Sequence, residues 1–128
     1  MFEKLGLTRM AQALAAHAGA RLGTVARNVA NADTPGYRAM DLPEFEQVYD
    51  GDSAFRMRST RPGHFDTDMA QSVARAVPSG GAMSPNGNDV SLDLQMMRAV
   101  EAKQSHEMAL AVYRNTSAII RTSLGRNS

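Results

Sequence analysis

The chain has 128 residues, of which 14 are lysine or arginine and 13 are aspartate or glutamate, so its formal net charge is only +1. This even balance provides no long-range field for nucleic acid or an anionic membrane. Because cysteine is absent, disulfide bonds, thiolate nucleophiles and zinc–thiolate sites are excluded. Tryptophan is also missing while methionine occurs nine times, so we expect thin helical seams instead of a thick aromatic core.

The first predicted element is a long helix over residues 2–32. Apolar residues recur along it at steps of three and four, which places them on one helical face: Leu7, Ala11, Leu14, Ala18, Leu22, Val25 and Val29. Gly19 and Gly23 lie inside this helix, where each glycine costs about 1 kcal/mol relative to alanine. Either the helix tolerates them, or with Ala15 they let the backbone of another subunit approach closely.

The beginning of this helix also mimics a secretory signal, because Lys4 and Arg9 precede an uncharged run at residues 10–20. Gln12 and His17 interrupt the run, however, and alanine dominates where leucine is usual. The run is also too short to span a bilayer. We therefore interpret it as part of the helix and expect no cleaved signal.

A distinctive stretch ends the first helix, with the sequence Asn28-Val29-Ala30-Asn31-Ala32-Asp33-Thr34-Pro35-Gly36-Tyr37-Arg38. Pro35 disfavours helical geometry at Thr34, and the pair Pro35-Gly36 suits the centre of a type II turn. Glycine or asparagine alone is enough to end a helix. The combination of two asparagines with a Thr-Pro-Gly turn is therefore more specific than a generic stop signal.

Residues 38–88 form a polar middle that is rich in turns. Its sizeable apolar residues are few, namely Phe45, Val48, Tyr49, Phe55, Met57 and Phe65. Alternating apolar and polar residues favour a short strand around Ala54–Ser59, and residues 78–88 have the composition of a flexible connection. We therefore expect an irregular segment with some β structure.

A second long helix is predicted over residues 91–124. Ser91 is a credible N-cap, Asp93 suits the positive end of the helix dipole, and Gly125 supplies a stop. The apolar face of this helix is interrupted by Gln104 and comprises Val90, Leu94, Met97, Met108, Ala111 and Ala118, with Ile119 widening it near the end. Pairing the two helices would bury both faces, although the apolar surface near Ile119 is too broad for one partner helix.

The predicted fold class is therefore mainly α, with long N- and C-terminal helices packed as a coiled-coil-like pair and a short, irregular, β-containing middle. The three expected parts are residues 1–37, 38–88 and 89–128. No catalytic constellation stands out, since His17, His64 and His106 are far apart and His106 lacks a second histidine one turn onward. We predict no enzyme, cofactor, metal site, nucleic acid or small-molecule substrate.

Three stretches resemble bacterial flagellar rod and hook proteins. Asn28–Arg38 is similar to the signature that these proteins share. Arg58-Ser59-Thr60-Arg61-Pro62-Gly63-His64 resembles the Thr-x-Pro-x-His turn of proximal rod subunits, and Gly87-Asn88-Asp89-Val90-Ser91-Leu92-Asp93 resembles the Gly-Asn-x-Val-x-Leu-Asp entry to their last helix.

The resemblance implies a structural subunit of the proximal rod, the hollow shaft in the flagellar basal body that crosses the periplasm and transmits torque from motor to hook. The implied partners are copies of the chain, other rod subunits, the adapter protein that joins the rod to the MS ring, and the flagellar type III apparatus, which exports such subunits without a cleaved signal.

The resemblance also implies roles for individual residues. The implied assembly motif comprises Asn28, Asn31, Thr34, Pro35, Gly36 and Tyr37. The apolar faces and the glycines of the two helices, independently of the resemblance, predict packing between helices or subunits at Leu7, Leu14, Gly19, Leu22, Gly23, Val25, Val29, Leu94, Met97, Met108, Ala111 and Ile119. Two alternatives stay open: a non-polymerising helical module that binds a partner or acts as an export chaperone, and a small hydrolase for which no catalytic residue can be nominated.

Overall fold

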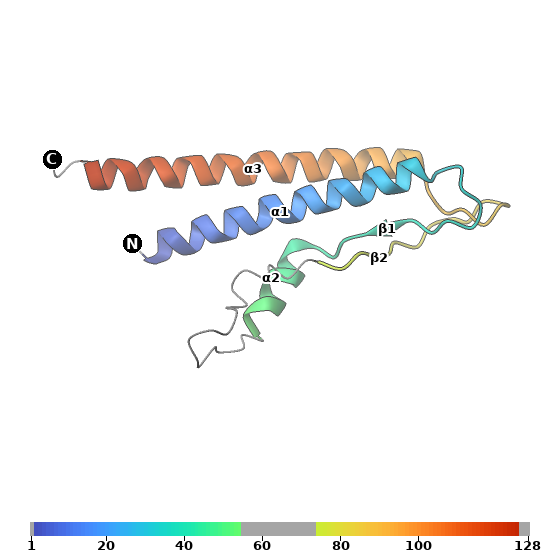
Figure 1. The fold of residues 1–128 in the computed structure, drawn as a ribbon, viewed down its shortest axis with the longest axis horizontal. Helices are drawn as coiled ribbons and strands as arrows, with labels where there is room; N and C mark the ends of the chain where they lie inside the picture. Colours follow the sequence, from blue (N-terminus) through green and yellow to red (C-terminus); the bar gives the residue numbers. More distant parts are fainter. Residues whose placement is uncertain (1, 55–73, 126–128) are drawn as a thin grey trace, which may run out of the picture.

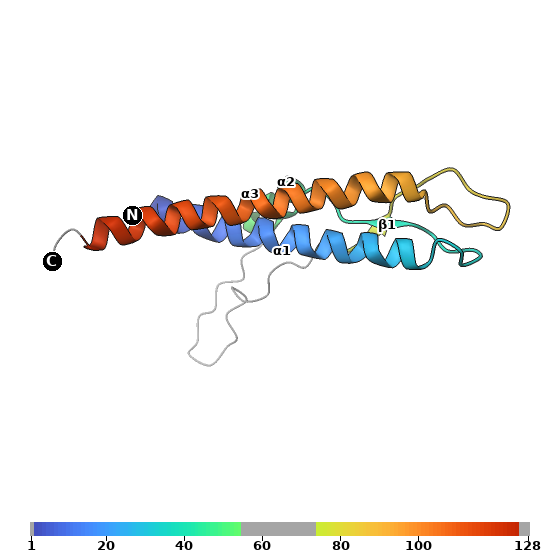
Figure 2. The same cartoon turned by 90° about the horizontal axis from the view of Figure 1, so that it is seen from above.

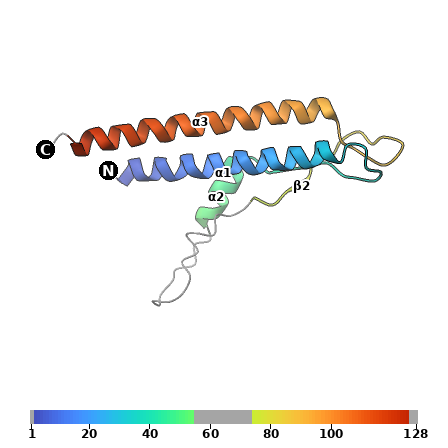
Figure 3. The ribbon, with the colours of Figure 1, turned by 45° about the horizontal axis from the view of Figure 1, so that its top comes forward.

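The computed structural model describes residues 2–54 and 74–125. Two long helices, α1 (Phe2–Ala30) and α3 (Leu92–Gly125), run side by side in opposite directions, so the two chain ends lie at the same end of the molecule (Figure 1). Views from two other directions show the same antiparallel hairpin (Figures 2 and 3). The expected fold class, mainly α with paired terminal helices, is confirmed. No helix in the described ranges combines the length and apolar character needed to cross a membrane.

Both helices have the terminal signals that the sequence indicates. The N–H of Tyr37 bonds to the carbonyl of Thr34 at 3.3 Å and Gly36 has a φ of 73°, which confirms the predicted turn with Pro35-Gly36 at its centre. At the start of α3, the N–H of Leu94 donates to Ser91 Oγ at 3.5 Å. Ser91 thus acts as the predicted N-cap.

The middle of the chain differs from its prediction. Strand β1 (Met40–Asp41) pairs antiparallel with β2 (Val77–Pro78), with Met40 opposite Pro78. A helix, α2 (Phe45–Ala54), follows β1. The strand expected at Ala54–Ser59 is wrong at Ala54, which ends α2, and residues 55–59 lie outside the described residues. The helix was missed because its hydrophobic residues are few and Gly51 interrupts it.

The faces of α1 and α3 that meet are lined mainly by small side chains. The buried residues of α1 include Ala11, Ala18 and Val25, and those of α3 are Gln95, Ala102, Ala109 and Thr116. Both sets recur every seven residues, the repeat that keeps one helical face toward a partner helix along its length. The seam is therefore thin, in agreement with the shortage of aromatic residues.

The face of α3 that was expected to pack on α1 lies on the outside of the hairpin. The exposed fractions are 38% for Leu94, 62% for Met97, 57% for Met108 and 51% for Ile119, and Ala111 is exposed as well. For packing inside the chain this expectation is wrong. Two regular rows of residues run along α3, and α1 packs against the row that contains the buried alanines. Gln95 belongs to this row, and its side chain bonds to Asn28 of α1.

On α1 the expected face is only partly enclosed. Val25 is buried and Leu14 is half-buried, whereas Leu7, Leu22 and Val29 are each more than two-fifths exposed. Gly19 and Gly23 are exposed on the side away from α3. Contact of these exposed residues with another subunit stays a prediction.

Candidate functional site

The two signature stretches, Asn28–Arg38 and Gly87–Asp93, lie together at the end of the hairpin opposite the chain termini (Figure 1). We call this region the motif junction. The described chain contains no group of three or more acidic or histidine side chains able to hold a metal ion. The bonds of the motif junction join amide and carboxylate side chains to backbone groups and to other side chains.

Asn88 caps the carbonyl end of α1 from a distant part of the sequence. The residue is buried, and its Nδ2 lies within hydrogen-bonding distance, 2.8–2.9 Å, of the carbonyl oxygens of Asn31, Ala32 and Thr34. Its Oδ1 accepts from the N–H of Val90 at 2.8 Å. These three carbonyls belong to the turn that directly follows Ala30, the last residue of α1, so this one side chain joins the end of α1 to the approach to α3.

Asp89 makes the next connection of the motif junction. Its buried carboxylate accepts from the N–H of Ala39 and lies 3.6 Å from Nη1 of Arg38. Two glycines allow this close approach: a Cβ added to Gly81 would lie 2.8 Å from the carbonyl oxygen of Asp89, and one added to Gly87 would lie 3.4 Å from Cα of Gly36. A side chain at Gly87 would push the two stretches apart, and one at Gly81 would collide with the backbone of Asp89.

Asn28 joins α1 to β1 and α3. Its Nδ2 donates to the carbonyl of Met40 at 2.7 Å and to Oε1 of Gln95 at 3.0 Å. Its Oδ1 accepts from the N–H of Met40 at 3.1 Å and from the hydroxyl of Tyr37 at 3.3 Å. Asn28 thus uses two donors and two acceptor positions, the full capacity of an amide side chain.

The rest of the implied assembly motif lies at the surface of the same junction. Asn31 donates through Nδ2 to the carbonyl of Arg27 at 2.8 Å, and its Oδ1 accepts from the hydroxyl of Thr34 at 3.2 Å. Thr34, Pro35 and Gly36 are exposed. The motif therefore has an inner part that bonds within the chain and an outer part that remains accessible.

An ionic cluster lies beside the seam, between α1, β1 and α3. Arg21 holds Asp41 through two bonds, Nε to Oδ1 at 3.0 Å and Nη2 to Oδ2 at 3.1 Å. Nε of Arg98 lies 3.3 Å from Oδ2 of Asp41, and Nη2 of Arg21 lies 3.6 Å from Oε2 of Glu101. One carboxylate therefore links both long helices to the first strand.

The pKa values of this cluster reflect its geometry. Burial tends to raise the pKa of Asp41, but the hydrogen bond from Arg21, the N–H of Leu42 and the charges of Arg21 and Arg98 outweigh it, so the pKa is lowered. The pKa of Arg21 is raised, chiefly through its hydrogen bond to Asp41. Both groups are thus held in their charged forms.

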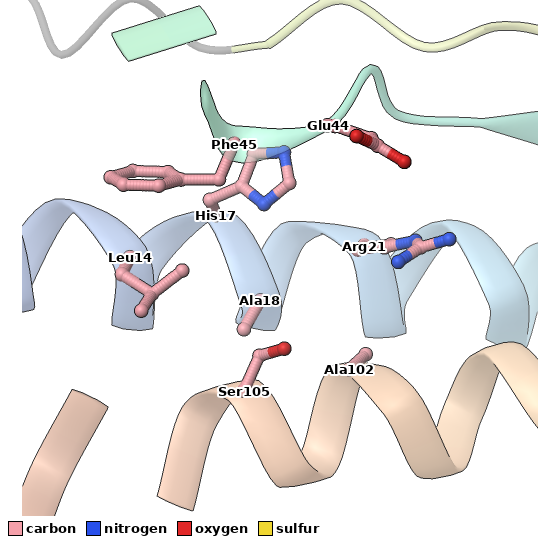
Figure 4. Close-up of a pocket in the computed structure, with 8 residues that line it drawn as sticks. All are labelled: Leu14, His17, Ala18, Arg21, Glu44, Phe45, Ala102 and Ser105. Carbon is pink, nitrogen blue, oxygen red and sulfur yellow. The ribbon is translucent and has the colours of Figure 1, made fainter. Parts of the chain in front are cut away.

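A pocket of about 140 Å³ opens where α2 approaches the hairpin (Figure 4). His17 lies at its edge, with Nε2 2.8 Å from the carbonyl oxygen of Pro43 and its ring edge-on to Phe45 at 5.7 Å. These contacts occupy His17 in holding α2 against α1. The pocket therefore lies at the joint where α2 packs on the hairpin.

The comparisons with known proteins agree with the motifs at the junction. Residues 6–38 match the model of the flagella basal body rod protein family. The chain is also 31% identical over 93 residues to the flagellar basal body rod protein FlgB of Agrobacterium fabrum strain C58, and the alignment covers 69% of each protein. The chain belongs to the flagellar basal body rod protein family.

This membership confirms the resemblance inferred from the sequence and makes the chain a flagellar basal body rod component. The matched segment of this rod protein comprises most of α1 and continues through the turn to Arg38. The partners of that turn, Asn88 and Asp89, lie outside the matched residues. Their sequence, Gly-Asn-Asp, was noticed as a motif, but only the fold shows that it bonds to the first one.

Proposed function

We propose that this rod protein is a proximal rod subunit that assembles helically, with copies of itself and other rod subunits, into the hollow shaft that transmits torque from motor to hook. In this proposal its role is structural and not enzymatic. The supporting observation is that the hairpin buries its small side chains and leaves many of its large apolar ones exposed.

The exposed apolar residues are spread along both helices. On α1 they include Leu5, Leu7, Met10, Leu22 and Val29; on α3 they include Leu92, Met96, Met97, Val100, Met108, Ile119 and Leu124. Extended apolar surface of this kind is typical of protein interfaces. Because the described residues leave this surface uncovered, neighbouring subunits are the proposed cover.

The bonds at the motif junction suit a part that bears load. Asn88 ties α1 to the start of α3, Asn28 ties α1 to Gln95, and Asp41 ties both helices to β1. These side chains connect the two helices at several points along part of their length, so that the helices resist sliding past one another. Contacts between unlike faces of such units extend into an open helical array when the rotation does not close.

The proposal includes the rod's position and its route there. The subunit would cross the periplasm as part of the rod, contact the adapter protein that joins the rod to the MS ring, and arrive through the flagellar type III apparatus with its amino-terminal segment intact. Ala11 and Ala18 are buried on the inner face of α1, so cleavage after residue 20 would remove much of the seam. This supports retention of the segment.

The test is the composition of basal bodies purified from the source bacterium. We expect mass spectrometry to find this chain in rods, with peptides from residues 1–20 present, and expect its deletion to prevent rod completion. A matched deletion of a hook protein should leave the chain in the remaining rods. Complete rods in the deletion strain, together with a stable discrete monomer or dimer in solution, would instead establish the non-polymerising module.

A further inference from the structure

We propose that the outward face of α3 in one copy packs against the small-residue face of α1 in a second copy. The α3 ridge is defined as Met97, Val100, Gln104, Met108 and Ala111, and the α1 small face as Ala16, Gly19, Ala20 and Gly23. This inference rests on the proposed function, because it specifies which two faces meet when subunits assemble.

Nothing in residues 2–54 and 74–125 requires glycine at the two glycine positions of the α1 small face. Each costs a helix about 1 kcal/mol relative to alanine. A Cβ added to Gly19 or Gly23 would meet nothing within 4 Å, and neither residue has a positive φ. Since neither backbone conformation nor packing within the described residues requires glycine here, the bare surface points to close approach by another chain.

The α3 ridge has the complementary shape. Its members follow one another at steps of three, four, four and three residues, which places them along one helical face. All five are exposed, and Met97, Val100 and Met108 each leave more than half of their surface uncovered. Large side chains on one helix and missing side chains on the other permit close packing of the two backbones.

Charge supports the same pairing. Asp93 accompanies the start of the ridge, and Glu107, followed one heptad later by Arg114, accompanies its other end, while Arg9 and Arg27 stand at the two ends of the small face. All five are exposed, and none forms an ion pair with another described residue. Opposite charges on two faces favour their association and set the register.

The relative direction of the two packed helices follows from assembly about one axis. Rotation about one axis and translation along it give every α1 the same sense along that axis, so where the helices run close to the axis direction, α3 of one copy meets α1 of the next in an antiparallel sense, as within the hairpin. If Arg27 lies beside Asp93, equal helical rises place Gly23 opposite Met97 and Ala16 opposite Gln104. Arg9 then lies about one turn from Glu107, within reach of its long side chain.

The absence of cysteine makes a direct test possible with the double variant Ala16→Cys/Gln104→Cys. Both positions are exposed and lie on opposite outward faces of the hairpin, so a disulfide can form only between copies. We expect oxidation of basal bodies containing this variant to give a ladder of covalent oligomers. The matched control is Ala16→Cys/Lys103→Cys, because Lys103 lies at the same height but about 100° around α3, outside the specific geometry of a disulfide.

The outcomes separate the inference from the proposed function. A ladder at least about tenfold stronger than the control supports the pairing of faces; no ladder, or an equal one, with the chain present in basal bodies overturns the pairing and leaves the proposed function standing. Absence of even the wild-type chain from basal bodies overturns the proposed function itself.

A charge exchange gives a second readout without cysteines. Arg9→Glu and Glu107→Arg should each reduce incorporation by about tenfold, and the double exchange should restore it, because a like-charge pair becomes an opposite pair again. Circular dichroism of each purified variant checks that the hairpin is unchanged. Equal loss in the single and double variants would contradict the proposed register.

Discussion

Asn28 and Gln95 bond to each other between the two long helices, Nδ2 to Oε1 at 3.0 Å, with 0% and 1% of their surfaces exposed. They are polar residues in a seam otherwise rich in alanine. A slip of one heptad would place Asn28 opposite Ala102 and leave its buried polar atoms without this partner, which is costly. The pair therefore specifies one register in a seam whose small apolar residues would accept several.

Replacing Asn28 by alanine is expected to destabilise the hairpin by about 3 kcal/mol, because the N–H and carbonyl of Met40 and Oε1 of Gln95 lose buried partners. Urea denaturation of the purified chain, followed by circular dichroism, measures the change. Asn31→Ala is the matched control, since that asparagine also bonds to a backbone carbonyl but at an exposed site; it should cost less than about 1 kcal/mol. Equal costs for the two variants would show that burial of the network is unimportant.

Asn88→Asp is expected to loosen the last turn of α1 more than Asn88→Ala does. The aspartate still accepts from Val90, but it has no donor for the three carbonyls and places a negative charge at the negative end of the helix dipole. We expect a loss of about 2 kcal/mol for alanine and more for aspartate. Hydrogen exchange of the amides at residues 27–34 checks this locally, with Asn115→Ala, at an exposed site on α3, as control. If the amides at residues 27–34 exchanged as slowly in Asn88→Asp as in the wild type, Asn88 would not be the cap of α1.

Much of the hairpin could be predicted from the sequence because its signals are local. The Thr-Pro-Gly turn, the Ser91 cap and the three-and-four spacing of apolar residues each depend on neighbours in the chain. The choice of face on α3 is different. Both rows are regular, and only the partners of Gln95, Ala102 and Ala109 across the seam decide which one is inside.

The site was predictable in outline and not in its bonds. Asn28 was singled out by its motif, and the stretch containing Asn88 was singled out by another. The amide of Asn88 reaches the end of α1 because the chain returns there after a long middle segment. Such a return leaves no periodic signal in the sequence. Asp41 was missed for the same reason, since its two arginines come from opposite ends of the sequence.

Acid is expected to weaken the hairpin through Asp41. Its pKa is lowered in the folded state relative to the ordinary value of 3.8, so its contribution to stability is fully present above that value and is lost as pH falls through the folded pKa. The urea midpoint should therefore fall below about pH 4. Asp41→Asn should lower the midpoint near neutral pH and flatten this part of the profile, whereas Asp33→Asn, at an exposed site, should leave it unchanged. If the urea midpoint of Asp41→Asn still fell with pH as steeply as that of the wild type, the acid sensitivity would come from other groups.

Neighbouring positions on α3 can separate folding from assembly. Met108 points outward and Ala109 lies in the seam. Met108→Asp should change the free energy of unfolding of the isolated chain by less than about 0.5 kcal/mol, as is usual for surface sites. It should nevertheless block incorporation into basal bodies, because it buries a charge between subunits.

Ala109→Leu should instead destabilise the chain itself by about 2 kcal/mol, since the thin seam has no room for a larger side chain. Urea denaturation and basal-body mass spectrometry on the same two variants measure both effects. Normal incorporation of Met108→Asp would mean that the outward face of α3 remains in water in the assembled rod.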